Sequence, residues 1–336
     1  MSGFDPDAAA TPDSGIFGLD CPVGDARIVL VPVPFAATVS YGGGAENGPD
    51  AMLAASHQVD LFDFHFGRVY EAGIHLLEAD PAVVEAHQQA RELAAPILAA
   101  GGVEPGDARV RDVDAAGERV NRSLRAQVEP LLDAGQIVGV LGGDHSIPYA
   151  AIAAAAARQP LGILHVDAHA DLRDAYEGFR WSHASIMHNV LADCPGVQRL
   201  VQVGIRDYGE GELRAIHGSD GRVVTHFDAD WQRRRFAGVT FDALVDEALQ
   251  ALPQRVWISV DIDGLDPALC PNTGTPVPGG LQFAELAHLL QRLADSGRQV
   301  VGFDLVEVAP GDDEWDANVG ARVLYKLCGA ALRSGR

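Results

Sequence analysis

The chain has 336 residues, of which 47% are hydrophobic, and its formal charge at pH 7 is −22. This composition excludes wholesale disorder, disfavours nucleic acid as a partner and favours small cationic molecules. No run approaches the ~18 apolar residues of a membrane span, so we expect no membrane partner. The acidic N-terminal segment lacks a basic and apolar export signal, and we therefore expect a cytoplasmic protein.

Hydrophobic runs separated by turn residues predict strands alternating with helices after an irregular arm at residues 1–25. Such alternation is typical of right-handed βαβ units, so we expect a mostly parallel sheet with helices on both faces. The predicted strands lie at 26–34, 136–141, 161–166, 200–205, 223–227, 256–260 and 300–308. The predicted helices lie at 50–56, 82–100, 112–134, 147–158, 182–192, 241–252, 283–296 and 319–333.

Aspartate and histidine residues gather directly after three of these strands. In parallel α/β sheets, sites form at the carboxyl ends of strands. Alternate residues of an extended backbone also point to the same side, so the spacing turns these groups toward one another. The six side chains are His145, Asp167, His169, Asp171, Asp261 and Asp263.

These four carboxylates would repel one another and raise each other's pKa values, and their burial without compensation is costly. Two divalent cations would balance the four negative charges, so the pattern predicts a two-metal centre rather than helix caps or solvated loop acids. A carboxylate-rich set favours Mn²⁺ over Zn²⁺, and the two imidazoles leave Ni²⁺, Co²⁺ or Fe²⁺ open. Because paired metals lower the pKa of a shared water, the centre indicates hydrolysis at carbon or phosphorus.

Five motifs together resemble the ureohydrolase family of arginases and agmatinases, and the likeness is strongest to agmatinases. The motifs are residues 142–146 (GGDHS), 167–171 (DAHAD), 259–267 (SVDIDGLDP), 274–277 (GTPV) and 307–310 (EVAP). The resemblance implies a three-layer α/β/α sandwich with an eight-stranded, mostly parallel central sheet, formed by a single domain at residues 26–336. It also implies two Mn²⁺ per chain, a homotrimer or homohexamer, and hydrolysis of a guanidinium C–N bond to urea and an amine. Residues 60–115 exceed what we expect of a minimal agmatinase, which suggests an insertion over the site mouth or at a subunit contact.

The resemblance also implies a role for each matching residue. The six side chains named above would hold the metals, and Asp171 would count among the catalytic residues as well. Glu307 would pair with the substrate guanidinium, since a carboxylate accepts two N–H bonds from that planar cation. His183 would protonate the leaving amine, although it is followed by Ala184 where the family has glycine. Thr275 would line the site, and Asp174 would contact the substrate tail.

The substrate stays open at this point. Agmatine, yielding putrescine and urea, is the first candidate. The alternatives are arginine, a guanidino acid, formiminoglutamate, and guanidine or an alkylguanidine. Residues 172–182 contain both arginines and acids, so they favour neither a carboxylate nor an ammonium group on the substrate tail. A metallophosphoesterase, a single-zinc deacetylase and a non-catalytic metal-binding subunit of a hetero-oligomer are the competing classes.

Overall fold

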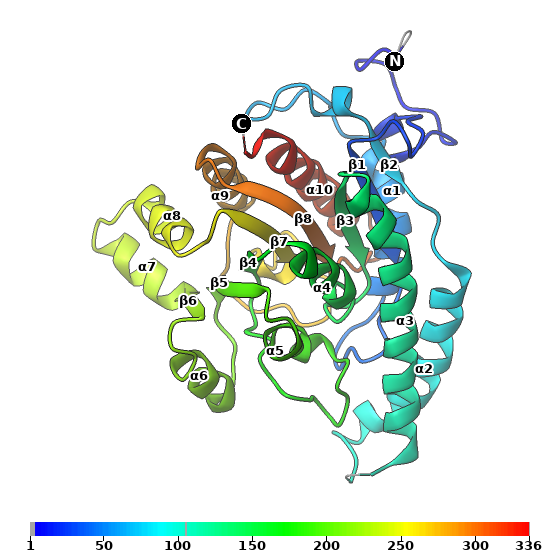
Figure 1. Cartoon of the computed structure of the whole chain (residues 1–336), viewed down its shortest axis with the longest axis vertical. Helices are drawn as coiled ribbons and strands as arrows, with labels where there is room; N and C mark the ends of the chain where they lie inside the picture. Colours follow the sequence, from blue (N-terminus) through cyan, green and yellow to red (C-terminus); the bar gives the residue numbers. More distant parts are fainter. Residues whose placement is uncertain (1–3, 105, 336) are drawn as a thin grey trace.

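A computed structural model describes residues 4–104 and 106–335 of the chain. Residues 1–3, 105 and 336, which belong to the predicted arm, insertion and domain, lie outside this part. Eight strands form one sheet in the order β2-β1-β3-β8-β7-β4-β5-β6, and every neighbouring pair is parallel (Figure 1). The strands are β1 (Ile28–Val33), β2 (Ile74–Leu76), β3 (Ile137–Gly142), β4 (Leu161–Val166), β5 (Val197–Ile205), β6 (Val223–Phe227), β7 (Arg255–Asp261) and β8 (Gln299–Val306). The predicted parallel α/β sheet is confirmed.

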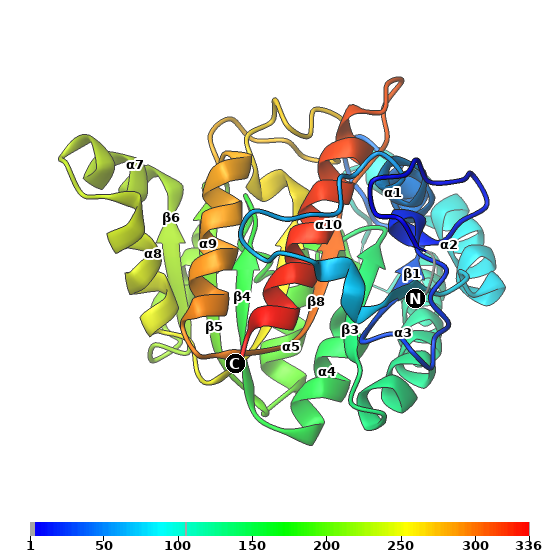
Figure 2. The same cartoon turned by 90° about the horizontal axis from the view of Figure 1, so that it is seen from above.

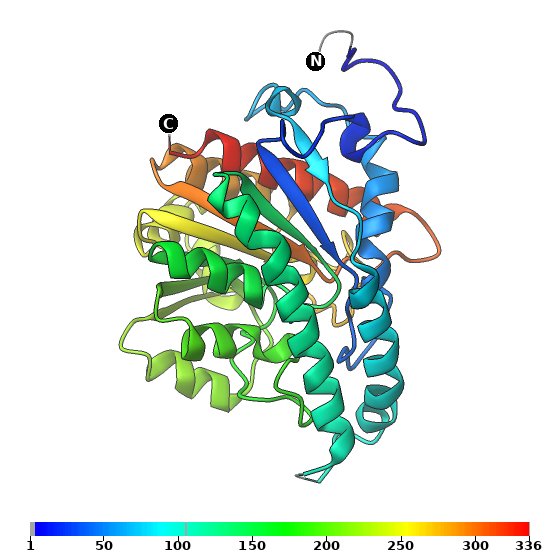
Figure 3. The same cartoon turned by 45° about the vertical axis from the view of Figure 1, so that its right-hand side comes forward.

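Helices cover both faces of the sheet and complete the three layers (Figure 2). One face carries α1 (Gly48–Ser56), α8 (Phe241–Gln250), α9 (Phe283–Asp295) and α10 (Trp315–Arg333). The other carries α3 (Ala108–Asp133), α4 (Tyr149–Arg158) and α5 (Ile186–Asp193). Helix α2 (Pro81–Ala99) pairs with α3 in a long antiparallel hairpin that extends beyond the sheet (Figure 3).

Alternate residues of each strand enter two separate hydrophobic layers, which explains why the strands are continuous apolar runs. In β4, Leu164 and Val166 pack in the layer of α9 and α10, whereas Leu161 and Ile163 pack in the layer of α4 and α5. Burial of both faces holds the strands rigidly and fixes where their carboxyl ends lie. Among the described residues, no helix is long and apolar enough to span a membrane.

Three elements lie outside the set predicted from the sequence. Strand β2 has three residues beside β1, too few to show a hydrophobic period. Helices α6 (Glu210–His217) and α7 (Asp228–Phe236) are mostly polar and lie at the edge strand β6. They have eight and nine residues and each buries a single apolar side chain, Ile216 and Trp231 respectively, so neither is long enough to establish a helical period in the sequence. The helix predicted at 182–192 begins as a 3-10 turn, His183–Ser185, and continues as α5.

The described part of the N-terminal arm packs on the core. Its 3-10 turn, Ile16–Gly18, buries Ile16 and Phe17 in the layer that contains α10. The Phe17 ring meets the Tyr325 ring edge-on at 4.8 Å, and its backbone N–H donates to Ser56 Oγ at the end of α1. The arm therefore adds apolar surface to the core, although within residues 4–25 this 3-10 turn is its only helix or strand.

Candidate active site

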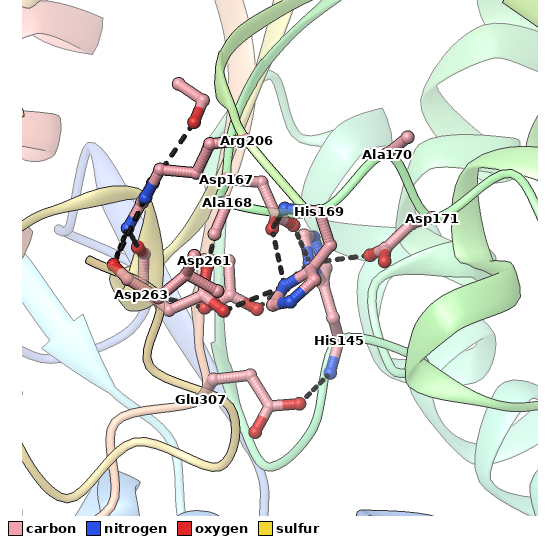
Figure 4. A network of polar contacts seen from close by, with 12 residues as sticks. His145, Asp167, Ala168, His169, Ala170, Asp171, Arg206, Asp261, Asp263 and Glu307 are labelled. Atoms are coloured by element: carbon pink, nitrogen blue, oxygen red, sulfur yellow. Dashed lines mark hydrogen bonds and ion pairs between the residues drawn. The ribbon is translucent and has the colours of Figure 1, made fainter. Parts of the chain in front are cut away.

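The loops after β3, β4 and β7 bring the six predicted side chains together at the carboxyl edge of the sheet (Figure 4). His145 Nδ1 lies 3.0 Å from Asp167 Oδ2, 3.2 Å from Asp171 Oδ2 and 3.3 Å from Asp261 Oδ2. His169 Nδ1 lies 3.0 Å from Asp263 Oδ2. All of these side chains except that of His169 are buried, so charge on them must be compensated inside the site.

Two candidate donor groups meet at Asp167. The first contains His145, His165, Asp167 and Asp171, and the second contains Asp167, His169 and Asp263. Within each group, the potential ligand atoms all lie within 4.8 Å of one another. The carboxylate and imidazole donors suit divalent cations, and the residues therefore fit metal ions on either side of Asp167.

The hydrogen bonds of His165 give it a supporting role rather than that of a ligand. Gln202 Nε2 donates to the carbonyl of Ala170 at 2.8 Å, which fixes the orientation of the amide. The same nitrogen lies 3.0 Å from His165 Nδ1, so Nδ1 accepts and Nε2 carries the ring proton. Nε2 then donates to Asp167 Oδ2 at 2.8 Å and orients this shared carboxylate.

A second buried network fixes the tautomer of His145. Ser259 Oγ donates to Asp304 Oδ1 at 2.8 Å, and Trp257 Nε1 donates to the other oxygen of Asp304. Because the hydroxyl proton is committed to Asp304, Ser259 Oγ accepts from His145 Nε2 at 2.9 Å. His145 Nδ1 therefore faces the carboxylates, so loss of its proton would leave its lone pair where a metal ligand needs it.

Arg206 holds the loop after β7 in place. It follows β5, and its Nη2 donates to the carbonyls of Asp263 and Leu265 at 2.7 and 3.1 Å. Sequence reasoning assigned no role to Arg206, Gln202 or Ser259, because their contacts depend on the order of the strands in the sheet. For His165, a signal was available: it stands two residues before Asp167 on one strand, and so on the same side.

Without a cation, protons compensate the buried carboxylates. Burial favours neutral His169, but hydrogen bonds to Asp167 and Asp263 outweigh it and raise the pKa of His169 to about 12. Burial opposes the charged form of His145 too, yet its bonds to Asp167 and Asp171 raise its pKa well above the ordinary value. Burial and the charge of Asp167 raise the pKa of Asp171 to about 6.

We expect metal binding to release these protons and to tighten as pH rises. Each proton displaced makes the apparent affinity about tenfold stronger per pH unit while the group is protonated in the metal-free protein. Titration calorimetry with Mn²⁺, in buffers of different ionisation enthalpy near pH 6.5 and pH 8, measures the affinity and the number of protons released. Equal affinities at the two pH values, with no proton release, would contradict the assignment of His145 and His169.

Glu307 and Asp171 both adopt a left-handed backbone, with φ angles of 60° and 55°. For residues other than glycine this conformation costs roughly 1–2 kcal/mol, which the surrounding structure must offset. Glu307 Oε1 accepts from the backbone N–H of His145 at 3.1 Å. Oε2 is buried and has no hydrogen-bond partner among the described residues. Burial and the charge of Asp144 raise the pKa of Glu307 well above its ordinary value, so this carboxyl group is poised to gain charge when a cation arrives.

A cavity of about 320 Å³ opens above the cluster. Its lining includes four predicted residues, namely His169, Asp171, His183 and Thr275. Asp174 is not part of the lining: its side chain is 95% exposed and pairs with His188 at 3.1 Å. Its contact with substrate stays a prediction.

Ala184 also lines this cavity, within the 3-10 turn that follows Ser182. It is not among the residues with positive φ, so its backbone conformation does not require the glycine that the family has there. Its N–H donates to Ser182 Oγ, which caps the turn. The departure from the family motif is therefore compatible with the local backbone.

A parallel α/β/α sandwich with a His/Asp cluster at its carboxyl edge is an arrangement that suits a metal-dependent hydrolase. The chain belongs to the arginase family, whose family model matches residues 26–329. It is 34% identical over 319 residues to the N(1)-aminopropylagmatine ureohydrolase of Thermus thermophilus, covering 94% of each chain. It is 31% identical to the proclavaminate amidinohydrolase of Streptomyces clavuligerus, covering 90% of this chain and 88% of the relative. The crystal structure of the agmatine ureohydrolase of Thermoplasma volcanium is similar, with a TM-score of 0.73, 26% identity, and coverage of 99% and 96%. The predicted family and enzyme class are confirmed.

Proposed function

We propose that the chain cleaves the guanidinium C–N bond of a compound with a cationic amine tail, releasing urea and an amine. Agmatine and its N(1)-aminopropyl derivative are the first candidates. The observation that carries the proposal is the buried, unpartnered Oε2 of Glu307 beside the His/Asp cluster. The names of relatives, N(1)-aminopropylagmatine ureohydrolase and agmatinase, support it.

We further propose that the six clustered side chains hold two Mn²⁺ ions, with Ni²⁺, Co²⁺ or Fe²⁺ as the alternatives. When bound, such a pair of ions would supply a water nucleophile at neutral pH. Asp167, common to both donor groups, would help to hold both ions. His165 and Ser259 keep the shared carboxylate and His145 in the required orientations.

Glu307 binds the substrate guanidinium with the oxygen that has no partner in the protein. Its Oε1 is already held by the His145 N–H, so the carboxylate cannot rotate freely. A guanidinium N–H donated to Oε2 would satisfy the buried oxygen and restore the charge of the group. This contact places the guanidinium carbon next to the cluster, and Thr275 contributes to the wall beside it.

His183 moves the proton that the leaving amine needs. In the metal-free chain, burial and the positive charges of His169 and His145 lower the pKa of His183 to about 4. Burial is the largest of these effects, and it persists when metal ions replace the protons of the other two histidines. The imidazole is therefore neutral at pH 7 and must first accept a proton from the attacking water. It then donates that proton to the amine nitrogen as the C–N bond breaks, which is general base and then general acid catalysis.

The outer wall of the cavity favours an ammonium tail over a carboxylate. Arg173 lines this wall, but its Nε lies 3.6 Å from Glu212 Oε2 and its guanidinium stacks on the Tyr176 ring at 4.7 Å. Asp207 also lines the wall and forms no ion pair with any described residue. The wall therefore keeps a net negative charge, and Tyr176 and Tyr208 offer aromatic faces to a cation.

A urea-release screen with Mn²⁺ tests the proposal. Agmatine and N(1)-aminopropylagmatine are expected to exceed arginine and guanidinobutyrate by about tenfold or more in kcat/KM, the effect of roughly 1.4 kcal/mol at the tail. Asp207→Asn should reduce the preference for agmatine over arginine. The same measurement on Asp174→Asn tests whether Asp174, the residue predicted from the sequence, contacts the substrate tail instead. Failure to release urea from any guanidino compound would overturn the proposal. Equal use of arginine would overturn the tail assignment alone.

His183→Ala tests the proton-transfer step separately from metal binding, because it leaves the six clustered side chains intact. We expect it to retain the metal content of the wild-type protein and to lose turnover by roughly 10²–10⁴-fold. His188→Ala, a histidine paired only with exposed Asp174, should behave like wild type. Wild-type rates for His183→Ala would remove it from the mechanism.

We also propose that residues 26–336 form the single catalytic domain, that residues 1–25 are an arm on it, and that the chain assembles as a homotrimer or homohexamer. The hydrophobic layers common to the whole sheet support a single domain. The family resemblance supports the assembly, which light scattering of the purified chain would measure.

A further inference from the structure

We propose that the α2–α3 hairpin positions the loop that carries the substrate-facing residues, and that Asp114 in α3 is its positioning residue. The loop, residues 172–182, is called the substrate loop here. The proposal goes beyond the proposed function, and only its kinetic readout rests on that function.

The substrate loop connects two residues of the site and contributes two more. Asp171 precedes it and His183 follows it, while Arg173 and Tyr176 line the cavity from within it. The loop contains no helix or strand, and its own backbone bonding is a bridge between Tyr176 and Phe179. Its shape must therefore come from contacts with neighbouring elements.

Asp114 supplies the polar anchor. Its Oδ1 accepts from the backbone N–H groups of Arg180 and Trp181 at 3.0 and 3.3 Å. The other side of the loop is tied to α5, where Asn189 Nδ2 donates to the carbonyl of Arg180 at 2.9 Å. The anchor acts directly before Ser182 and His183, and Asp114 itself does not line the cavity.

Packing against α3 adds a steric anchor. A Cβ at Gly117 would lie 2.7 Å from the Cβ of Trp181, so the indole side chain rests where α3 has no side chain. Glycine inside a helix costs roughly 1 kcal/mol relative to alanine, which indicates that this close approach matters. The Trp181 ring also meets Tyr149 of α4 edge-on at 4.8 Å.

The end of the hairpin contacts the loop at a third point. The side chains of Val110 and Val103 lie 3.3 and 3.9 Å from where a Cβ at Gly178 would stand. The contacts thus follow one another along α3, from Gly178 beside Val110 to Trp181 beside Gly117. The predicted insertion at 60–115 ends within this surface, and its predicted place at the site mouth or at a subunit contact stays a prediction.

Loss of the anchor should affect substrate binding more than the chemical step. Within the loop, Tyr176 bonds through its backbone to Phe179, and Arg173 N–H donates to the Ala184 carbonyl at 3.1 Å. The residues that flank the loop are held more firmly, because the Asp171 carbonyl accepts from Met187 and His188, and His183 lies in the 3-10 turn that Ser182 caps. We therefore expect Asp114→Ala to raise KM for agmatine roughly tenfold and to change kcat by less than about threefold, as for one lost charge-assisted contact. Asp114→Asn keeps an oxygen acceptor and should restore most of the affinity.

Hydrogen exchange of the full chain, combined with steady-state kinetics, tests the proposal. In Asp114→Ala the amides of Arg180 and Trp181 should exchange at least tenfold faster, whereas Asp112→Ala, an exposed aspartate on the same helix, should leave them unchanged. Gly117→Ala favours the helix but displaces Trp181, so it should raise KM without loss of helicity.

Faster exchange at residues 180–181 together with a raised KM supports the positioning role. Unchanged exchange, or an unchanged KM, would overturn it. Faster exchange in a chain whose wild type releases no urea would support the anchor and overturn the proposed function, so the two failures are distinguishable.

Discussion

Replacing Asp167 with asparagine is expected to remove metal binding and urea release while leaving the fold intact. Asp167 is the residue common to both donor groups, and it also accepts from His165 and from the backbone N–H of His169. Asparagine keeps the shape of the side chain but replaces one acceptor oxygen by a donor, which faces imidazole nitrogens and repels a cation. The loss should exceed the roughly 100-fold that removal of a supporting contact costs.

Elemental analysis and urea release measure this effect, and circular dichroism checks the fold. Asp266→Asn is the matched control, because Asp266 belongs to the motif at 259–267 but its carboxylate accepts from Ala268 N and Gln282 Nε2 and not from the cluster. If Asp167→Asn still bound two ions per chain, metal binding by the cluster would not depend on the shared carboxylate.

Glu307→Gln is expected to retain both metals and to lose binding of the guanidinium. The glutamine oxygen can still accept from the His145 N–H, so the amide NH₂ group takes the place of the unpartnered Oε2. A donor there faces the N–H groups of the substrate. Removing one partner of a buried charge pair costs about 2–5 kcal/mol, or roughly 30- to 4,000-fold in kcat/KM.

The matched control is Glu314→Gln, an exposed glutamate before α10. It should leave both metal content and kcat/KM unchanged. If Glu307→Gln hydrolysed agmatine with the wild-type kcat/KM, another residue would have to bind the guanidinium.

The meeting of the six clustered side chains was predictable because local rules determine their positions, whereas their role as metal ligands stays a proposal. Asp167, His169 and Asp171 follow an apolar run at alternate positions, and Asp261 and Asp263 do the same after β7. The carboxyl ends of parallel strands then meet without further information. The polar helices α6 and α7 and the strand β2 were missed because each is too short to establish a period in the sequence.

Contacts that depend on the order of the strands in the sheet could not be predicted from the sequence. His165 and Gln202 are paired in register on β4 and β5, yet 37 positions separate them in the chain. The contact of Asp114 with the substrate loop likewise follows from the packing of α3. The left-handed backbones of Asp171 and Glu307 are a third case, because a sequence rule assigns that conformation to glycine rather than to an acid.

The most direct test of the account follows metal content and chemistry in one titration. Wild-type chain is stripped with a chelator, Mn²⁺ is returned stepwise, and urea release from agmatine is recorded with the bound metal per chain. We predict no turnover in the stripped chain and a rate that reaches its plateau when two ions are bound. Full turnover without stoichiometric metal, or no urea with both ions in place, would contradict a two-metal guanidino hydrolase.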